Sequence, residues 1–408
     1  MLPDLARARA AQPTLLDADR PALLRTLAAA LRRAEPEILS ANRCDLDAAE
    51  QRGTPPPLID RLLLDRGRLL QVAGSLEEIA ALPEPLEQVL ACWEHPNGLR
   101  IQQVTVPFGL IAVIYESRPN VTVDVAGLAL RAGSAAYLRG STAAARSNRA
   151  ILAALRSGLA EFGLPEALLA HSCLEDRSDI AALLAARHLV DLLVPRGGAE
   201  LIRWVVEQAK VPVLETGAGV CHLFLDEDAD LEMAKAVVVN AKCQRPGVCN
   251  AIETLLVHRA CAERLLPAIC KELRDRGVEL RGDAAVRALF PAARPATEDD
   301  WAAEYLDLVL AVRVVSSLEE AVSHINRFGT HHSDGIVTSS PQRGRSFQRS
   351  VDSAVVYVNS STRFTDGAEF GFGAELGIST QKLHARGPVG LAQLVTTQYR
   401  VDGSGQVR

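Results

Sequence analysis

The feature that most constrains the fold of this 408-residue chain is a repeated order of short apolar runs and helix-length segments. From Val106 onward the links between these segments are short, and the apolar runs have strand length. The predicted strands are 109–115, 134–139, 189–194 and 211–214, and the predicted helices are 123–131, 143–162 and 199–210. Strands and helices in this order are typical of a parallel sheet covered by helices. The sequence therefore predicts an α/β fold.

The regions around this core complete the predicted organisation. Residues 1–90 have the apolar periodicity of amphipathic helices. The turn sequence His95-Pro96-Asn97-Gly98 separates two strand-like segments, which predicts a hairpin. A second α/β unit follows, with helices at 231–243 and 262–276 and strands at 252–258, 308–315 and 335–338. Residues 359–390 are rich in glycine and loop-like, and a last strand is expected at 393–401.

Composition and charge exclude several classes of function. The net charge of −6 gives the chain no overall attraction for a nucleic acid. No apolar run approaches the ~18 residues of a membrane span, and the N-terminus lacks the layout of a secretion signal. The eight cysteines form no CxxC pair, and no histidine follows them at zinc-ligand spacing. We therefore expect a cytoplasmic protein with reduced thiols, no bound metal, and no nucleic-acid or membrane partner.

Cys249 is the first candidate for chemistry, because it lies in a loop between a predicted helix and a predicted strand. The pair Pro246-Gly247 favours a tight, open backbone there, and Arg245 supplies positive charge that favours a thiolate. Backbone N–H groups and the Asn250 amide are candidates for stabilising an oxyanion. From these residues alone, a buried loop cysteine is as good an interpretation as a nucleophile. Cys243, on the preceding helix, is the better candidate for a core residue.

Other predicted strand ends also carry candidate polar residues. Glu215 follows the predicted strand 211–214, at the edge where open α/β sheets place ligands. Its carboxylate suits a general base, a cofactor contact or a loop cap, and the loop cap is the simplest interpretation. The turns Arg196-Gly197-Gly198 and Arg139-Gly140-Ser141 suit a cofactor phosphate, because each joins a strand to a helix N-terminus. Such turns are common, so each is a weak signal alone, and the two support each other.

One string is specific enough to indicate a family. The segment Tyr115-Glu116-Ser117-Arg118-Pro119-Asn120-Val121-Thr122-Val123-Asp124 resembles the signature of the gamma-glutamyl phosphate reductases, also called glutamate-5-semialdehyde dehydrogenases. Further blocks agree with this resemblance: 194–198, 240–253 and the glycine-rich block 364–377, which runs on to 388. The similarity extends in order over about residues 20–408.

The resemblance implies a fold and a reaction. The expected fold is that of the aldehyde dehydrogenase superfamily, with a parallel-sheet cofactor domain (1–90 and 107–224), an α/β catalytic domain (225–385) and a small β oligomerisation flap (91–106 and 386–408). The expected reaction, in proline biosynthesis, converts gamma-glutamyl phosphate and NADPH into glutamate-5-semialdehyde, NADP and phosphate. The superfamily nucleophile falls on Cys249, so a thioester on this residue is the expected intermediate.

The resemblance also implies roles for individual residues. Asn120, expected in a loop at a strand end, is the candidate oxyanion donor. Arg139 falls where the superfamily keeps a basic residue near the adenosine ribose, and Glu304 resembles the glutamate that contacts the nicotinamide ribose. The candidates for substrate binding are Arg118, His332 and Arg363. Gly247 departs from the family pattern, which has serine there, and the glycine is expected to loosen that turn.

Glu215 leaves a second function open, because it matches the position of the superfamily's hydrolytic base. A reductase that releases phosphate has no use for a base that activates water. The alternative is therefore an aldehyde dehydrogenase of another substrate, with Glu215 as deacylating base. A thiol acyltransferase without hydride transfer, and a scaffold that docks a glutamate kinase, are two further alternatives. In relatives the hairpin and the last strand pair across subunits, so a homo-oligomer is expected, and a glutamate kinase is a candidate partner.

Overall fold

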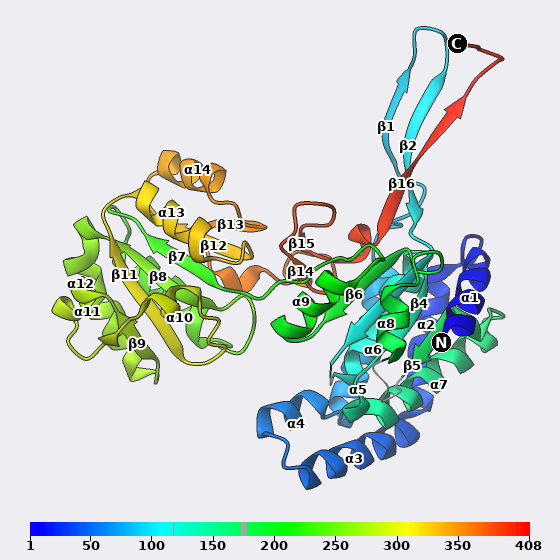
Figure 1. The fold of residues 1–408 in the computed structure, drawn as a ribbon, viewed down its shortest axis with the longest axis horizontal. Coiled ribbons are helices and arrows are strands. Elements are labelled where there is room, and N and C mark those ends of the chain that lie inside the picture. Colours follow the sequence, from blue (N-terminus) through cyan, green and yellow to red (C-terminus); the bar gives the residue numbers. More distant parts are fainter. Residues whose placement is uncertain (117, 173–177) are drawn as a thin grey trace. The chain divides into compact units, whose positions relative to one another are not determined.

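Short parallel strands covered by helices build the chain, which confirms the predicted α/β fold (Figure 1). The structure is a computed structural model that describes residues 1–116, 118–172 and 178–408, so Ser117 and Cys173 lie outside the described part. The chain divides into two compact units. The first unit comprises Met1–Thr216, Gly371–Gly377 and Val389–Arg408, and the second comprises Gly217–Phe370 and Ile378–Pro388. No helix within the described residues is long and apolar enough to cross a membrane.

Amphipathic helices begin the first unit, as their periodicity predicts. They are α1 (Leu2–Ala11), α2 (Arg20–Arg33), α3 (Glu35–Gln51), α4 (Pro56–Leu62) and α5 (Arg66–Ala81). Asp19 caps α2 and Asp65 caps α5, each by accepting a hydrogen bond from a backbone N–H of the first turn. Leu23, Leu27 and Leu31 follow one another at helical spacing on α2 and are fully buried. This stripe faces inward, where α2 packs against α5 and α7.

A parallel sheet in the order β5-β4-β3-β6 forms the core of the first unit. Its strands are β3 (Leu110–Tyr115), β4 (Ala135–Arg139), β5 (Leu169–Ser172) and β6 (Leu192–Arg196). The helices of this region are α6 (Pro119–Arg131), α7 (Ala145–Glu161), α8 (Ser178–Leu184) and α9 (Ala199–Gln208). Every residue of β3 is buried, as expected for a central parallel strand. The prediction of a strand at 211–214 was wrong. Val213 makes only an isolated parallel bridge to Leu193 there, and this segment forms no continuous β-ladder.

A three-stranded antiparallel sheet projects from the first unit (Figure 1). Its strands are β1 (Val89–Glu94), β2 (Arg100–Pro107) and β16 (Val395–Asp402), with β2 in the centre. The turn between β1 and β2 contains Gly98 at φ +87°, a left-handed conformation that favours glycine, so the predicted hairpin is confirmed. The rings of Trp93 and Tyr399 lie 6.1 Å apart, edge to face, across this sheet.

A seven-stranded parallel sheet in the order β10-β9-β11-β8-β7-β12-β13 forms the second unit. Its strands are β7 (Cys221–Leu225), β8 (Ile252–His258), β9 (Glu279–Gly282), β10 (Arg294–Pro295), β11 (Val309–Val315), β12 (Ser333–Val337) and β13 (Val355–Val358). Its helices are α10 (Leu231–Cys243), α11 (Arg259–Asp275), α12 (Ala284–Leu289), α13 (Leu318–Phe328) and α14 (Pro341–Ser350). The glycine-rich region 359–390 holds two short paired strands, β14 (Ile378–Ser379) and β15 (Gly387–Pro388).

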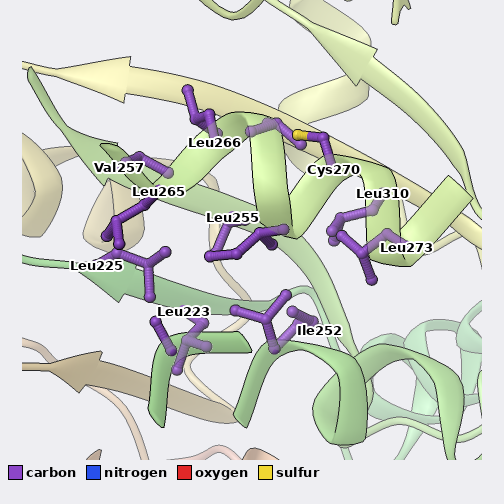
Figure 2. Close-up of a cluster of buried hydrophobic side chains, with 14 of the residues drawn as sticks. Leu223, Leu225, Ile252, Leu255, Val257, Leu265, Leu266, Cys270, Leu273 and Leu310 are labelled. Carbon is purple, nitrogen blue, oxygen red and sulfur yellow. The ribbon is translucent and has the colours of Figure 1, made fainter. Parts of the chain in front are cut away.

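Both faces of this sheet are buried, because alternate side chains of each strand enter different cores. On β7, Leu223 and Leu225 join a cluster with side chains of α11, among them Leu265 and Leu273 (Figure 2). Phe224, between the two leucines, joins a separate cluster with side chains of α13 and α14. The central strands β7 and β8 are therefore buried at every position.

Candidate active site

Parallel strands bring four loops to one edge of the second-unit sheet. Gly219 precedes β7, Cys249 precedes β8, Glu304 precedes β11 and His332 precedes β12. These four strands are neighbours in the sheet and run parallel, so their amino ends meet at the same edge. The loop that carries the candidate nucleophile therefore lies at the same edge of the sheet as the loops that precede the other three strands.

The loop that carries Cys249 joins α10 to β8 and makes a tight turn, in which Ala251 N–H donates to Val248 O at 3.1 Å. Cys249 is partly exposed. Gly219 lies directly against it, because a β-carbon at position 219 would stand 1.5 Å from the carbonyl oxygen of Cys249. Cys243, at the end of α10, packs against the hydrophobic core, and burial raises the pKa of its thiol. Of these two cysteines, Cys249 is the one in an open loop.

Glu304 is bound to the same corner of the sheet. Its Oε1 atom accepts a hydrogen bond from Gly219 N–H at 2.6 Å. Gly219 thus contacts Cys249 with its α-carbon and Glu304 with its amide. The structure brings together these two predicted site residues, which are far apart in the sequence.

A buried polar chain lies behind the Cys249 loop. The Cys221 thiol donates to the Cys249 carbonyl oxygen at 3.2 Å, and its sulfur lies 3.6 Å from His332 Nδ1. His332 Nδ1 lies 2.8 Å from the Ser333 hydroxyl oxygen, which is 2.7 Å from that of Thr365. Burial raises the pKa of Cys221 well above its usual value and lowers the pKa of His332 to about 4. Both groups are therefore neutral near neutral pH, and no pattern in the sequence pointed to Cys221.

Arg363 and Asn250 connect the glycine-rich region to the Cys249 loop. Asn250 Nδ2 donates to the Thr365 carbonyl oxygen at 2.9 Å, and Arg363 donates through Nη1 to Asn250 Oδ1. Arg363 Nε donates to Gln244 Oε1 at 2.9 Å. Burial and the neighbouring Arg245 lower the pKa of Arg363. The Asn250 amide therefore holds the backbone of 363–365, so the expectation that it serves an oxyanion is not supported by this arrangement.

Asn120 lies in the first turn of α6, not in a strand-end loop as expected. The reason is Pro119, which occupies the first helical position, where its missing N–H costs nothing. Arg118 is exposed and precedes this helix. Asn120 Nδ2 donates to Asp124 Oδ2 at 3.4 Å, and the Ser75 hydroxyl donates to Asp124 Oδ1 at 3.0 Å. Burial raises the pKa of Asp124 to about 6.

The turn Arg196-Gly197-Gly198 ends β6 and leads into α9. The Gly198 amide donates to Glu116 Oε2 at 3.2 Å, and a β-carbon on Gly197 would stand 2.7 Å from the Glu116 carboxyl carbon. A carboxylate thus already occupies the helix N-terminus, where a phosphate was expected. A phosphate at this turn would compete with Glu116 for the Gly198 amide.

The turn Arg139-Gly140-Ser141 ends β4. A β-carbon on Gly140 would stand 2.3 Å from Asn148 Nδ2, so a side chain there would require the buried Asn148 to move. Arg139 is partly exposed and donates through Nη1 to the Gly140 carbonyl oxygen at 3.1 Å. Glu215 is also partly exposed, at the end of the first unit's main segment. The first unit holds the predicted site residues Arg118, Asn120, Arg139 and Glu215 and the turn 196–198.

The chain is similar to known proteins over almost its full length. The model of the aldehyde dehydrogenase family matches residues 5–287. The gamma-glutamyl phosphate reductase of Moorella thermoacetica is 53% identical over 94% of this chain and 92% of its own length. That of Thermoanaerobacter pseudethanolicus is 50% identical over 99% of this chain and 98% of its own length.

A solved structure gives the same result. The gamma-glutamyl phosphate reductase of Thermotoga maritima superimposes with a TM-score of 0.98 at 46% identity, covering 100% of this chain and 99% of that one. An acetylating aldehyde dehydrogenase from Geobacillus thermoglucosidasius, at 15% identity and a TM-score of 0.69, shares the fold. The chain therefore belongs to the aldehyde dehydrogenase family and, within it, to the family of the gamma-glutamyl phosphate reductases.

Proposed function

We propose that this chain reduces gamma-glutamyl phosphate to glutamate-5-semialdehyde with NADPH and releases phosphate, as a step of proline biosynthesis. Membership of the aldehyde dehydrogenase family makes the chain an oxidoreductase. The names of relatives at 53% and 50% identity support the substrate. The observation that carries the proposal is the partly exposed Cys249, held at a sheet edge beside Gly219 and Glu304.

Cys249 is the proposed nucleophile. Its thiolate attacks the acyl carbon of the substrate, the bond from that carbon to the phosphate oxygen breaks, and a thioester forms. The nicotinamide cofactor, when bound, supplies the hydride that reduces this thioester. The thiohemiacetal on Cys249 then collapses to the aldehyde and returns the thiolate. Asn120 is the proposed donor to the oxyanion that develops on the acyl oxygen.

Two side chains suit the proposed cofactor best. Glu304 presents a partly exposed carboxylate beside the Cys249 loop, which suits the hydroxyls of the nicotinamide ribose. Arg139 is partly exposed at the end of β4, which suits the ribose phosphate of NADP. The turn 196–198 is a weaker candidate, because Glu116 holds its amide.

The candidates for substrate binding differ in their surroundings. Arg363 is bound to Asn250, the residue after Cys249, so its guanidinium suits an anionic group of the substrate. Arg118 is exposed beside Asn120, which supports the same role from the first unit. His332 is fully buried behind Cys221, and this position favours support of the Cys249 loop over direct substrate contact.

The reverse reaction tests the proposal. The protein is mixed with glutamate-5-semialdehyde, NADP and phosphate, and NADPH absorbance is compared with that of a reaction without phosphate. NADP reduction that depends on phosphate is the expected result. Reduction without phosphate would instead indicate a hydrolytic aldehyde dehydrogenase in which Glu215 activates water. The absence of reduction with either mixture would contradict the substrate assignment.

The three-stranded sheet of β1, β2 and β16 is proposed to pair across subunits, which makes the protein a homo-oligomer. Exposed apolar side chains on its outer strands support this role. A glutamate kinase that delivers the labile acyl phosphate stays a predicted partner, and co-sedimentation of the two proteins checks it.

A further inference from the structure

A fully buried ion pair flanks the loop that carries Cys249. Lys242 is in the last turn of α10 and Glu253 is in β8, so the two residues stand at opposite ends of the loop. Lys242 Nζ donates to Glu253 Oε2 at 2.6 Å, and neither side chain has any exposed surface. The pair therefore ties together the base of the Cys249 loop.

The same carboxylate holds a second segment. Glu253 Oε1 accepts a hydrogen bond from Leu306 N–H at 3.2 Å. Leu306 has φ +52°, a left-handed conformation that leucine rarely adopts, so this backbone depends on its surroundings. Two residues earlier, Glu304 accepts from Gly219 N–H, and Gly219 lies against the Cys249 carbonyl. One carboxylate thus links the Cys249 loop to the segment that carries Glu304.

Stability alone does not explain why a lysine and a glutamate occupy this place. Burial opposes charge on both side chains, since it raises the pKa of Glu253 and lowers that of Lys242. A well-packed apolar pair is often as stable as a buried ion pair. The ion pair adds hydrogen bonds of defined geometry, which an apolar pair lacks. Glu253 accepts one from Lys242 and one from Leu306 N–H, so the segments that carry these two residues are fixed relative to each other.

We infer that Lys242 and Glu253 are positioning residues that fix the thiol of Cys249 relative to Glu304. The inference rests on the proposed roles of Cys249 and Glu304. Cys249 has to reach the acyl carbon, and Glu304 has to place the cofactor so that hydride reaches that same carbon. A displacement of about 1 Å between reacting groups lowers a rate roughly 100-fold.

The double variant Lys242→Met/Glu253→Leu removes both charges and leaves no buried charge unpaired. We expect it to fold, with kcat lowered about 10- to 100-fold and the substrate KM changed less than about threefold. Hydrogen exchange is expected to become faster in 244–251 and 304–306 and to stay unchanged elsewhere. A merely structural role would not produce this localised exchange together with a fall in kcat.

The matched control is Asp226→Leu/Arg343→Met. Asp226 follows β7, so this pair lies at the opposite edge of the same sheet, and its carboxylate is equally buried. The control is expected to keep wild-type kcat. Wild-type kcat and exchange in the Lys242/Glu253 double variant, or an equal loss of kcat in the control, would overturn the inference.

Two further variants keep the outcomes separable. Turnover by Cys249→Ala would overturn the proposed nucleophile, whereas an inactive Cys249→Ala together with a wild-type double variant would overturn only the positioning role. If the double variant does not fold, Lys242→Met/Glu253→Gln replaces it, because the glutamine carbonyl keeps an acceptor for Leu306 N–H. A lowered kcat in that variant supports the inference, and wild-type kcat overturns it.

Discussion

The α-carbon of Gly219 lies against the carbonyl oxygen of Cys249, so closely that a β-carbon at 219 would be 1.5 Å from that oxygen. The Gly219 amide donates to Glu304 Oε1 at 2.6 Å. A single glycine before β7 therefore sets the separation between the proposed nucleophile and the carboxylate proposed to hold the cofactor. Glycine is required here for close approach rather than for an unusual φ.

Gly219→Ala is expected to displace the Cys249 loop, because the new β-carbon and the carbonyl oxygen cannot overlap and the backbone must move. We expect kcat/KM to fall at least about 100-fold and the free energy of unfolding to fall by about 1–3 kcal/mol. Steady-state kinetics and thermal melting measure the two effects. The control is Gly74→Ala, since a β-carbon on Gly74 in α5 meets nothing within 4 Å. Full activity of Gly219→Ala would show that the loop has another position in solution.

Cys249→Ala is expected to abolish turnover and to leave cofactor binding intact, because the thiol forms the thioester but does not hold the nicotinamide. Enzyme assays and fluorescence titration with NADPH measure the two properties. The control is Cys243→Ala, a partly buried thiol of the same region whose pKa is raised by burial. Substantial turnover by Cys249→Ala combined with an inactive Cys243→Ala would move the nucleophile to position 243.

The sequence predicted elements best where a long pattern had clear ends. The helix 231–243 and the strand 252–258 have the observed bounds of α10 and β8. Asp230 caps the helix, and the strand is a short run in which every residue is buried. By contrast, β7 was not predicted, because five residues beside a glycine-rich link show no period of their own. Hydrogen bonds to the adjacent strands β8 and β12 make this segment a strand.

The candidate site was predictable only in part. Cys249 was found from its local Pro246-Gly247 turn, and Glu304 was found from the resemblance to a family. Gly219, Cys221 and the Lys242–Glu253 pair were not found as parts of one site, although each bears on the Cys249 loop. These residues are important because the amino ends of particular strands lie side by side at one edge of the sheet. Only the order of the strands in the sheet determines which amino ends are neighbours.

The sheet of β1, β2 and β16 is expected to form the contact between subunits. The outer strand β16 carries Tyr399 and Val401, which are 60% and 54% exposed. Tyr399→Glu/Val401→Glu adds charge to this strand and is expected to lower the molar mass measured by size-exclusion chromatography with light scattering. Val407→Glu, beyond the end of β16, is the control and is expected to change nothing. A wild-type protein that is monomeric at micromolar concentration would contradict the predicted oligomer.

Asp124 is expected to make stability depend on pH, because burial raises its pKa to about 6. An unfolded aspartate has a pKa of about 4, so the folded state binds this proton more tightly. The stability that Asp124 contributes is therefore fully present below about pH 4 and is lost as the pH rises through about 6. Asp124→Asn cannot ionise and still accepts the Ser75 hydrogen bond. The Tm of Asp124→Asn minus that of wild type is expected to increase from about pH 4 to about pH 8. The corresponding change in the free energy of unfolding is at most about 3 kcal/mol.

The same variant tests whether Asp124 orients Asn120. In the wild-type protein the Asp124 carboxylate accepts a hydrogen bond from the Asn120 amide. In Asp124→Asn the new side chain can present its own NH₂ group to Asn120, and this hydrogen bond is then lost. We therefore expect kcat to fall even at pH values where Tm rises. Ser75→Ala is the matched control, because it removes the other hydrogen bond of Asp124 without touching Asn120. A pH-independent Tm difference between Asp124→Asn and wild type would show that Asp124 titrates normally. Unchanged kcat would show that Asn120 needs no support from this carboxylate.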